Sequence, residues 1–152
     1  MLVHRNRNDE TIAARPGAVL ISAKERSAVV KAPVKDGEPQ YQLVQPPKFF
    51  GLVKVSYAFC STDRPSFVFY DNGKFYAHVL NVGDPAGASG YNTDSHLLYW
   101  AICHEKILRV SDLASEEVAK RASELGYHRV PAADKGQYEF KNRRRMLRFF
   151  GF

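Results

Sequence analysis

The sequence contains few of the residues that stabilise small secreted proteins or bind metal ions. Its 152 residues include only two cysteines, Cys60 and Cys103, and neither a CxxC nor an HxxxH pair occurs. Because the ligand spacing typical of zinc sites is missing, we expect no metal ion and no cofactor. Each cysteine lies in a strongly hydrophobic segment, so the sequence favours two buried thiols in a reducing compartment over a disulfide.

Long hydrophobic runs are missing as well. No apolar stretch approaches the roughly 18 residues that a membrane-spanning helix requires. The opening residues MLVHRNRNDE lack the apolar core of a secretory signal. We therefore expect a cytoplasmic protein without membrane contact. If the protein comes from a phage, which is one of the origins considered below, the expected location is the host cytosol.

The sequence does contain enough apolar residues for one folded core. Hydrophobic residues make up 45% of the chain and aromatic residues 12%, which is sufficient for one domain of this length but not for two. We expect a single domain spanning residues 1–152, with a basic N-terminal arm and an arginine-rich C-terminal segment.

Positive charge is concentrated at the two ends of the chain. The formal net charge is +6, and residues 1–64, 65–134 and 135–152 contribute +4, −3 and +5 to it. The basic character therefore belongs to the two ends, while the middle is mildly acidic. This distribution favours an anionic partner that contacts the terminal segments.

The first half of the chain alternates in the manner of β-strands. GLVKVSYAF places Val53, Val55, Tyr57 and Phe59 on one face, the period of two that a half-buried strand requires. SFVFY and FYAHVLN flank an Asn-Gly dipeptide, which predicts a hairpin that pairs Tyr70 with Phe75 and Phe67 with His78. Shorter strands are expected at 18–22, 27–32 and 40–44, with the KER segment as a link between the first two.

The second half carries helical signals. Thr93 or Asp94 is expected to cap a mostly buried helix over SHLLYWAICHEKI, and Ser111 or Ser115 to begin the helix that contains SEEVAKRASEL. A strand and a short helix are expected at the C-terminus. We predict an α+β fold: an antiparallel sheet of about five or six strands, mostly from residues 18–81, with helices at about 94–107, 113–125 and 140–150 on one face.

Two groups of residues are candidates for catalysis or ligand binding. A cysteine nucleophile with histidine and aspartate partners would draw on Cys60, His78, Asp94 and His96, although nothing in the sequence makes them neighbours. The loop VGDPAGASGYN has glycines at Gly83, Gly87 and Gly90 before a predicted helix, a place where backbone N–H groups can approach a phosphate. It lacks the lysine of a P-loop and the G-x-G-x-x-G spacing of a dinucleotide site, so an ordinary surface connection remains the simpler interpretation.

The C-terminal segment NRRRMLRFFGF is the strongest candidate for partner binding. As a helix it would place its apolar residues on one side and its arginines on the other. Arginine donates two parallel hydrogen bonds to phosphates and carboxylates and stacks on rings. The alternative is structural, with the arginines paired to Glu116, Glu117 and Glu124. The predicted partner-binding residues are Arg143, Arg144, Arg145, Arg148 and Lys141, together with Arg5 and Arg7.

These patterns favour a non-enzymatic binding or assembly protein that engages an anionic macromolecule, either nucleic acid, a ribonucleoprotein or an acidic protein surface. A phage or mobile-element accessory protein, such as an inhibitor of a host defence complex, would fit this description. Two alternatives remain open. One is a small enzyme or nucleotide-binding domain that uses the loop at 82–92, and the other is a homo-oligomer of the virion type in which the C-terminal phenylalanines enter a neighbouring subunit.

Overall fold

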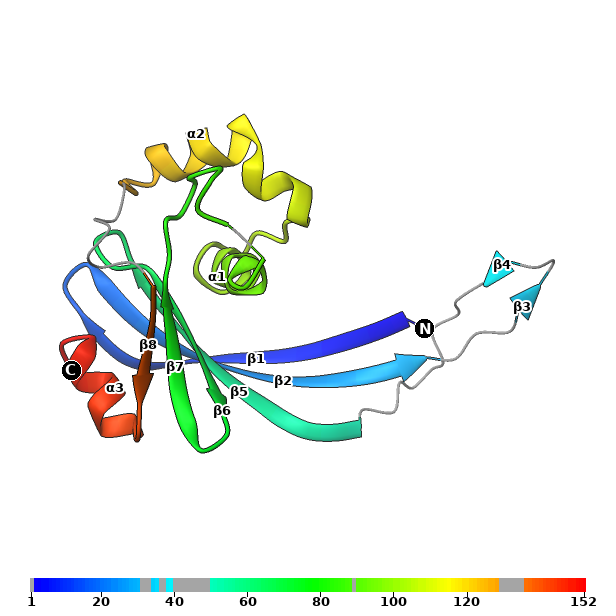
Figure 1. Cartoon of the computed structure of the whole chain (residues 1–152), viewed down its shortest axis with the longest axis horizontal. Helices are drawn as coiled ribbons and strands as arrows, with labels where there is room; N and C mark the ends of the chain where they lie inside the picture. The colour runs from blue at the N-terminus through cyan, green and yellow to red at the C-terminus, as the bar shows by residue number, and fades with distance from the viewer. Residues whose placement is uncertain (1, 31–33, 36–37, 40–49, 89, 129–135) are drawn as a thin grey trace.

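The computed structural model describes residues 2–30, 34–35, 38–39, 50–88, 90–128 and 136–152 (Figure 1). Side chains are described for residues 9–24, 55–88, 90–128 and 136–152. The strand expected at 40–44 therefore lies outside the described residues.

The fold is built on a six-stranded antiparallel sheet in the order β1-β2-β5-β6-β7-β8. Within this sheet, each strand pairs with the strand that comes before or after it along the chain, so the sheet is a meander. A separate pair, β3 and β4, lies between β2 and β5 in the sequence. The strand bounds are β1 (Leu2–Arg15), β2 (Ala18–Val30), β3 (Val34–Lys35), β4 (Glu38–Pro39), β5 (Phe50–Ser61), β6 (Ser66–Asp71), β7 (Lys74–Val79) and β8 (Gly136–Phe140).

The first three strands of the sheet are about twice as long as the last three. The β2–β5 pairing runs from Ala18–Ser61 to Ser27–Phe50, whereas the β5–β6 pairing ends at Ser56–Phe69. The outer parts of β1, β2 and β5 consequently project as a curved three-stranded arm (Figure 1). The expectation that the KER segment links two strands is wrong, because it lies inside β2.

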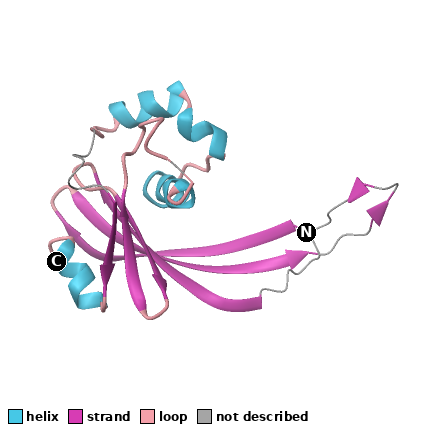
Figure 2. Ribbon diagram, in the orientation of Figure 1, coloured by secondary structure: helices cyan, strands magenta, loops and turns pink. Residues whose placement is uncertain are grey.

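Helices cover both faces of the sheet (Figure 2). On one face lie α1 (Thr93–His104), a 3-10 turn η1 (Val110–Ala114) and α2 (Glu116–Glu124), which bury a core around Trp100 and Phe67. The other face carries α3 (Arg143–Phe149), whose Met146 packs with Phe59 in a second core. The α+β fold with a six-stranded antiparallel sheet is confirmed. One detail differs: α1 and α2 share a face, but α3 does not lie on it with them.

The hairpin of β6 and β7 has the predicted register. Tyr70 lies opposite Phe75 and Phe67 opposite His78. Asn72 and Gly73 have φ angles of 50° and 76°, as a type I′ turn requires. The Asn-Gly dipeptide therefore predicted both the turn and the register of β6 and β7 correctly.

The pairing state of the two cysteines corrects the sequence interpretation. Cys60 at the end of β5 and Cys103 in α1 form a disulfide, with an S–S distance of 2.01 Å. The thiols are therefore not free, and the cysteines no longer support a reducing compartment. Among the described residues, no helix is both long enough and apolar enough to cross a membrane.

Candidate functional site

The helix α3 is fastened to the sheet through its apolar residues and its C-terminal end. Met146 and Phe150 are fully buried, and the Phe150 ring lies 4.6 Å from that of Phe59. Phe149 packs against Tyr138 and Phe140 of β8. The C-terminal phenylalanines, which the oligomer alternative placed in a neighbouring subunit, thus fill the core of their own chain.

Arg15 at the end of β1 and Arg64 in the connection between β5 and β6 bind the last carbonyls of α3. Arg15 Nε donates to the Phe150 carbonyl at 3.3 Å, and Arg64 Nη1 donates to the Phe149 carbonyl at 3.4 Å. The Arg64 guanidinium also lies 4.7 Å from the centre of the Phe149 ring. A cation at a helix C-terminus is favoured by the helix dipole, so both contacts stabilise α3. No local sequence pattern indicates these contacts, because they join residues 135 and 85 positions apart.

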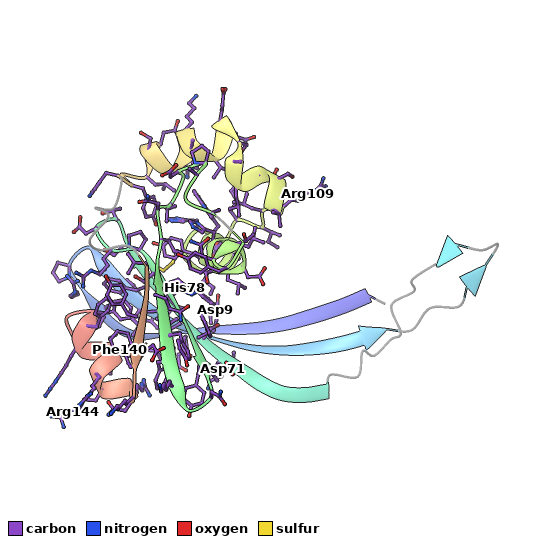
Figure 3. The ribbon with its side chains drawn as sticks, viewed as in Figure 1. Asp9, Asp71, His78, Arg109, Phe140 and Arg144 are labelled. Carbon is purple, nitrogen blue, oxygen red and sulfur yellow. A yellow bond between two sulfur atoms is a disulfide. The ribbon has the colours of Figure 1, made fainter. Side chains whose placement is uncertain are left out.

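α3 also carries an arginine cluster, which we define as Arg143, Arg144 and Arg145 in its first turn together with Arg148 in its last turn. All four side chains are exposed, and Arg144 is labelled in Figure 3, where it extends away from the sheet. Among the described side chains, none of the four takes part in an ion pair or a side-chain hydrogen bond. The guanidinium groups are available to a partner.

The structural alternative for these arginines does not hold within the described residues. Glu117 pairs with Lys106 at 3.7 Å, and Glu124 pairs with Arg121 at 3.5 Å. Both glutamates belong to α2, on the face of the sheet that α3 does not cover. The arginine cluster therefore has no carboxylate partner from α2.

The three first-turn arginines of the cluster oppose helix stability. Asn142 caps α3 by accepting the Arg145 N–H at 3.0 Å, so Arg143, Arg144 and Arg145 occupy the first turn. Cations there meet the positive end of the helix dipole. By contrast, α2 begins with Glu116 and Glu117 and has an arginine in its last turn. Because positive charge in the first turn is unfavourable for the helix itself, Arg143, Arg144 and Arg145 require another explanation.

The other predicted partner-binding residues are less informative. Lys141 is exposed and lies just before α3. The backbones of Arg5 and Arg7 lie in β1, within the projecting arm, whereas their side chains fall outside the described set. The structure therefore places Lys141 beside the arginine cluster and leaves the roles of Arg5 and Arg7 as predictions.

The glycine-bearing loop after β7 is an ordered structure with internal partners. Asp84 accepts the Ala86 N–H at 2.9 Å, and the Gly87 carbonyl accepts from Asn92 Nδ2 at 3.1 Å and from His96 Nε2 at 3.2 Å. A Cβ atom on Gly83 would collide with Ala122 of α2, and one on Gly87 would lie 2.8 Å from the Asn81 carbonyl oxygen. Two of the three glycines therefore permit close packing, while Gly90 faces open space.

The residues of the catalytic alternative do not form a reactive set. The sulfur of Cys60 is in the disulfide. Buried His78 contacts Ser95 Oγ at 2.7 Å and Gln137 Oε1 at 2.8 Å, and Asp94 is exposed. Burial lowers the pKa of His96 to about 4, so this histidine is neutral at pH 7. The described contacts of both histidines fasten loops and strands together.

A second polar network includes Tyr127, which lines a cleft between the loop and α2. His104 Nε2 contacts the Tyr127 hydroxyl at 2.6 Å, which lies 2.8 Å from the Tyr99 hydroxyl. Burial raises the pKa of both tyrosines and lowers that of His104. The cleft has a volume of about 320 Å³ and is lined by Asp84, Ser123 and His128, among others. Within the described residues, no three metal-ligating side chains gather there or elsewhere.

Comparison of the chain with family models, curated proteins and solved structures finds no match.

Proposed function

We propose that this protein binds an anionic macromolecule through the arginine cluster and that it does so without catalysis. One observation carries the proposal: three arginines occupy the first turn of α3, where the helix dipole disfavours them, and no described carboxylate pairs with them. A bound polyanion would supply the missing negative charge.

The fold supports this role because it holds the cluster rigidly at an exposed position. The apolar side of α3 is buried in the second core, and Arg15 and Arg64 bind its C-terminal carbonyls. Because the backbone of an anchored helix is already ordered, only the arginine side chains lose conformational freedom when a partner binds. Lys141 is exposed at the start of the same segment and adds a fifth positive charge.

A pair of matched variants tests the proposal. Arg143→Glu/Arg144→Glu and Arg109→Glu/Lys120→Glu each lower the formal net charge from +6 to +2, but Arg109 and Lys120 are exposed residues of the other helical layer. On immobilised heparin, the wild type and the second variant should elute at similar salt concentrations, and the first variant should elute much earlier. Equal early elution of both variants would show that only total charge matters, which would contradict the proposal.

A further inference from the structure

An aromatic row adjoins the arginine cluster on the sheet face that α3 partly covers. The row consists of Tyr70 on β6, Phe75 on β7 and Phe140 on β8, which lie opposite one another in successive strand pairs. Directly opposed residues of antiparallel strands project to the same face. The rings of Tyr70 and Phe75 are 4.9 Å apart, and Phe140 lies 5.0 Å from Phe149 of α3.

The aromatic row is accessible at its outer end. Tyr70 is 54% exposed, and Phe75 and Phe140 are partly exposed. Because adjacent strands lie about 4.8 Å apart, the row spans about 10 Å across the sheet. Arg143 follows Phe140 by three residues, and the start of α3 lies at the same end of the sheet as the β6–β7 turn (Figure 1). The aromatic row and the first arginines of α3 therefore lie at the same end of the sheet.

Nearby carboxylates are directed away from the face that carries the aromatic row. Asp71 follows Tyr70 and Glu139 precedes Phe140, so strand alternation directs both acidic side chains to the opposite face. Glu139 is paired there with Lys74 at 3.4 Å. The face that carries the aromatic row and the arginine cluster is thus free of these two negative charges.

We propose that the anionic partner is a single-stranded nucleic acid whose bases stack on the aromatic row while its phosphates bind the arginine cluster. This inference rests on the proposed function and specifies its ligand. Stacking on aromatic side chains together with a cationic track is the general mode of single-strand binding, because every base has a π-face. A duplex keeps its bases stacked inside the helix, and an acidic protein surface would engage the arginines without requiring the exposed tyrosine.

The test measures binding of residues 1–152 to three labelled probes by fluorescence anisotropy: an oligothymidine, a duplex of equal length and poly-glutamate. Tyr70→Ala should weaken oligothymidine binding about 5- to 150-fold and leave any duplex binding unchanged, while Tyr70→Trp should retain affinity. The matched control is Tyr91→Ala, which removes a tyrosine that is 64% exposed on the opposite face, where it contacts His78. Circular dichroism checks that each variant is folded.

The outcomes separate this inference from the proposed function. Arg143→Glu/Arg144→Glu should abolish oligothymidine binding, and the wild-type affinity should fall with salt at a log–log slope of about −3, as expected for about four phosphate contacts. Equal affinity for duplex and single strand, with no effect of Tyr70→Ala, would overturn the inference and leave the proposed function standing. Binding of poly-glutamate without binding of either nucleic acid would also overturn the inference and leave the proposed function standing. Binding to none of the probes would overturn both.

Discussion

Cys60 on β5 and Cys103 in α1 are joined by a disulfide, with their Cα atoms 5.6 Å apart and 43 residues of sequence separation. The bond fastens α1 to the sheet face that it covers, next to the core that contains Tyr99 and Trp100. It therefore closes a loop that includes β6, β7 and most of α1.

Removal of this disulfide should destabilise the protein. In the loop-entropy description, a disulfide that closes a loop of 43 residues lowers the conformational entropy of the unfolded chain and so stabilises the folded protein by about 4 kcal/mol. We expect Cys60→Ala/Cys103→Ala to lower the urea midpoint accordingly, and dithiothreitol to lower that of the wild type but not of the variant. Alkylation of both cysteines in the folded, unreduced protein would contradict the pairing.

Substitution of Gly83 should disturb the contact between the loop and α2. Its φ angle is +82°, and an added Cβ would collide with Ala122. Gly83→Ala should therefore cost about 2–4 kcal/mol from backbone strain and overpacking. Gly90→Ala is the control, because no atom lies within 4 Å of the added Cβ, and we expect a change below about 0.5 kcal/mol. If Ala122→Gly fails to relieve part of the Gly83→Ala loss, the collision is not the cause.

Local sequence signals predicted those elements that local interactions determine. The Asn72-Gly73 turn fixed the hairpin register, and Ser115 with its two following glutamates marked the start of α2. β1 was missed because residues 2–15 are largely polar and lack a regular apolar alternation. The side of the sheet on which α3 packs depends on the connection around β8, which carries no local signal.

The candidate site likewise contains features that local sequence predicts and features that only the folded chain reveals. Exposure of the arginine cluster follows from the helical pattern of NRRRMLRFFGF, so the sequence predicted it. Arg15 and Arg64, which bind the C-terminal carbonyls of α3, are distant in sequence and could not be recognised from composition or spacing. The disulfide was missed because hydrophobic flanking residues suit a buried thiol and a buried disulfide equally well.

His96 should make stability depend on pH. Burial holds its folded pKa at about 4, below the ordinary value of 6.5, so the unfolded state binds more protons between these pH values. Stability should therefore rise with pH from about 4 to 6.5, by about 3 kcal/mol from this group. Urea denaturation across this range measures the slope.

His96→Gln provides the comparison for this pH dependence. It removes the titrating group, so the slope between pH 4 and 6.5 should become smaller than in the wild type. Part of the slope should remain, because burial also lowers the pKa of His104. An unchanged slope in the variant would show that His96 is not responsible.

Arg15 and Arg64 should control the mobility of α3. Arg15→Ala/Arg64→Ala removes two hydrogen bonds to the helix C-terminus and the cation–π contacts with Phe59, Phe149 and Phe152. We expect a stability loss of about 1–3 kcal/mol and faster amide exchange throughout 146–150. Arg143→Ala/Arg144→Ala is the control, since neither side chain has a described partner. Equal exchange in both variants would mean that apolar packing alone holds α3.

Replacement of the first arginines of α3 should improve the helix while removing binding. Glutamate at 143 and 144 reverses an unfavourable dipole interaction, so Arg143→Glu/Arg144→Glu should raise the free energy of unfolding by about 0.5–2 kcal/mol at low ionic strength, an effect that salt should reduce. If these arginines instead served the fold, the variant would be less stable than the wild type. The opposite changes in stability and heparin affinity would show that the sequence retains positive charge at this helix end for a partner, because the fold itself favours negative charge there.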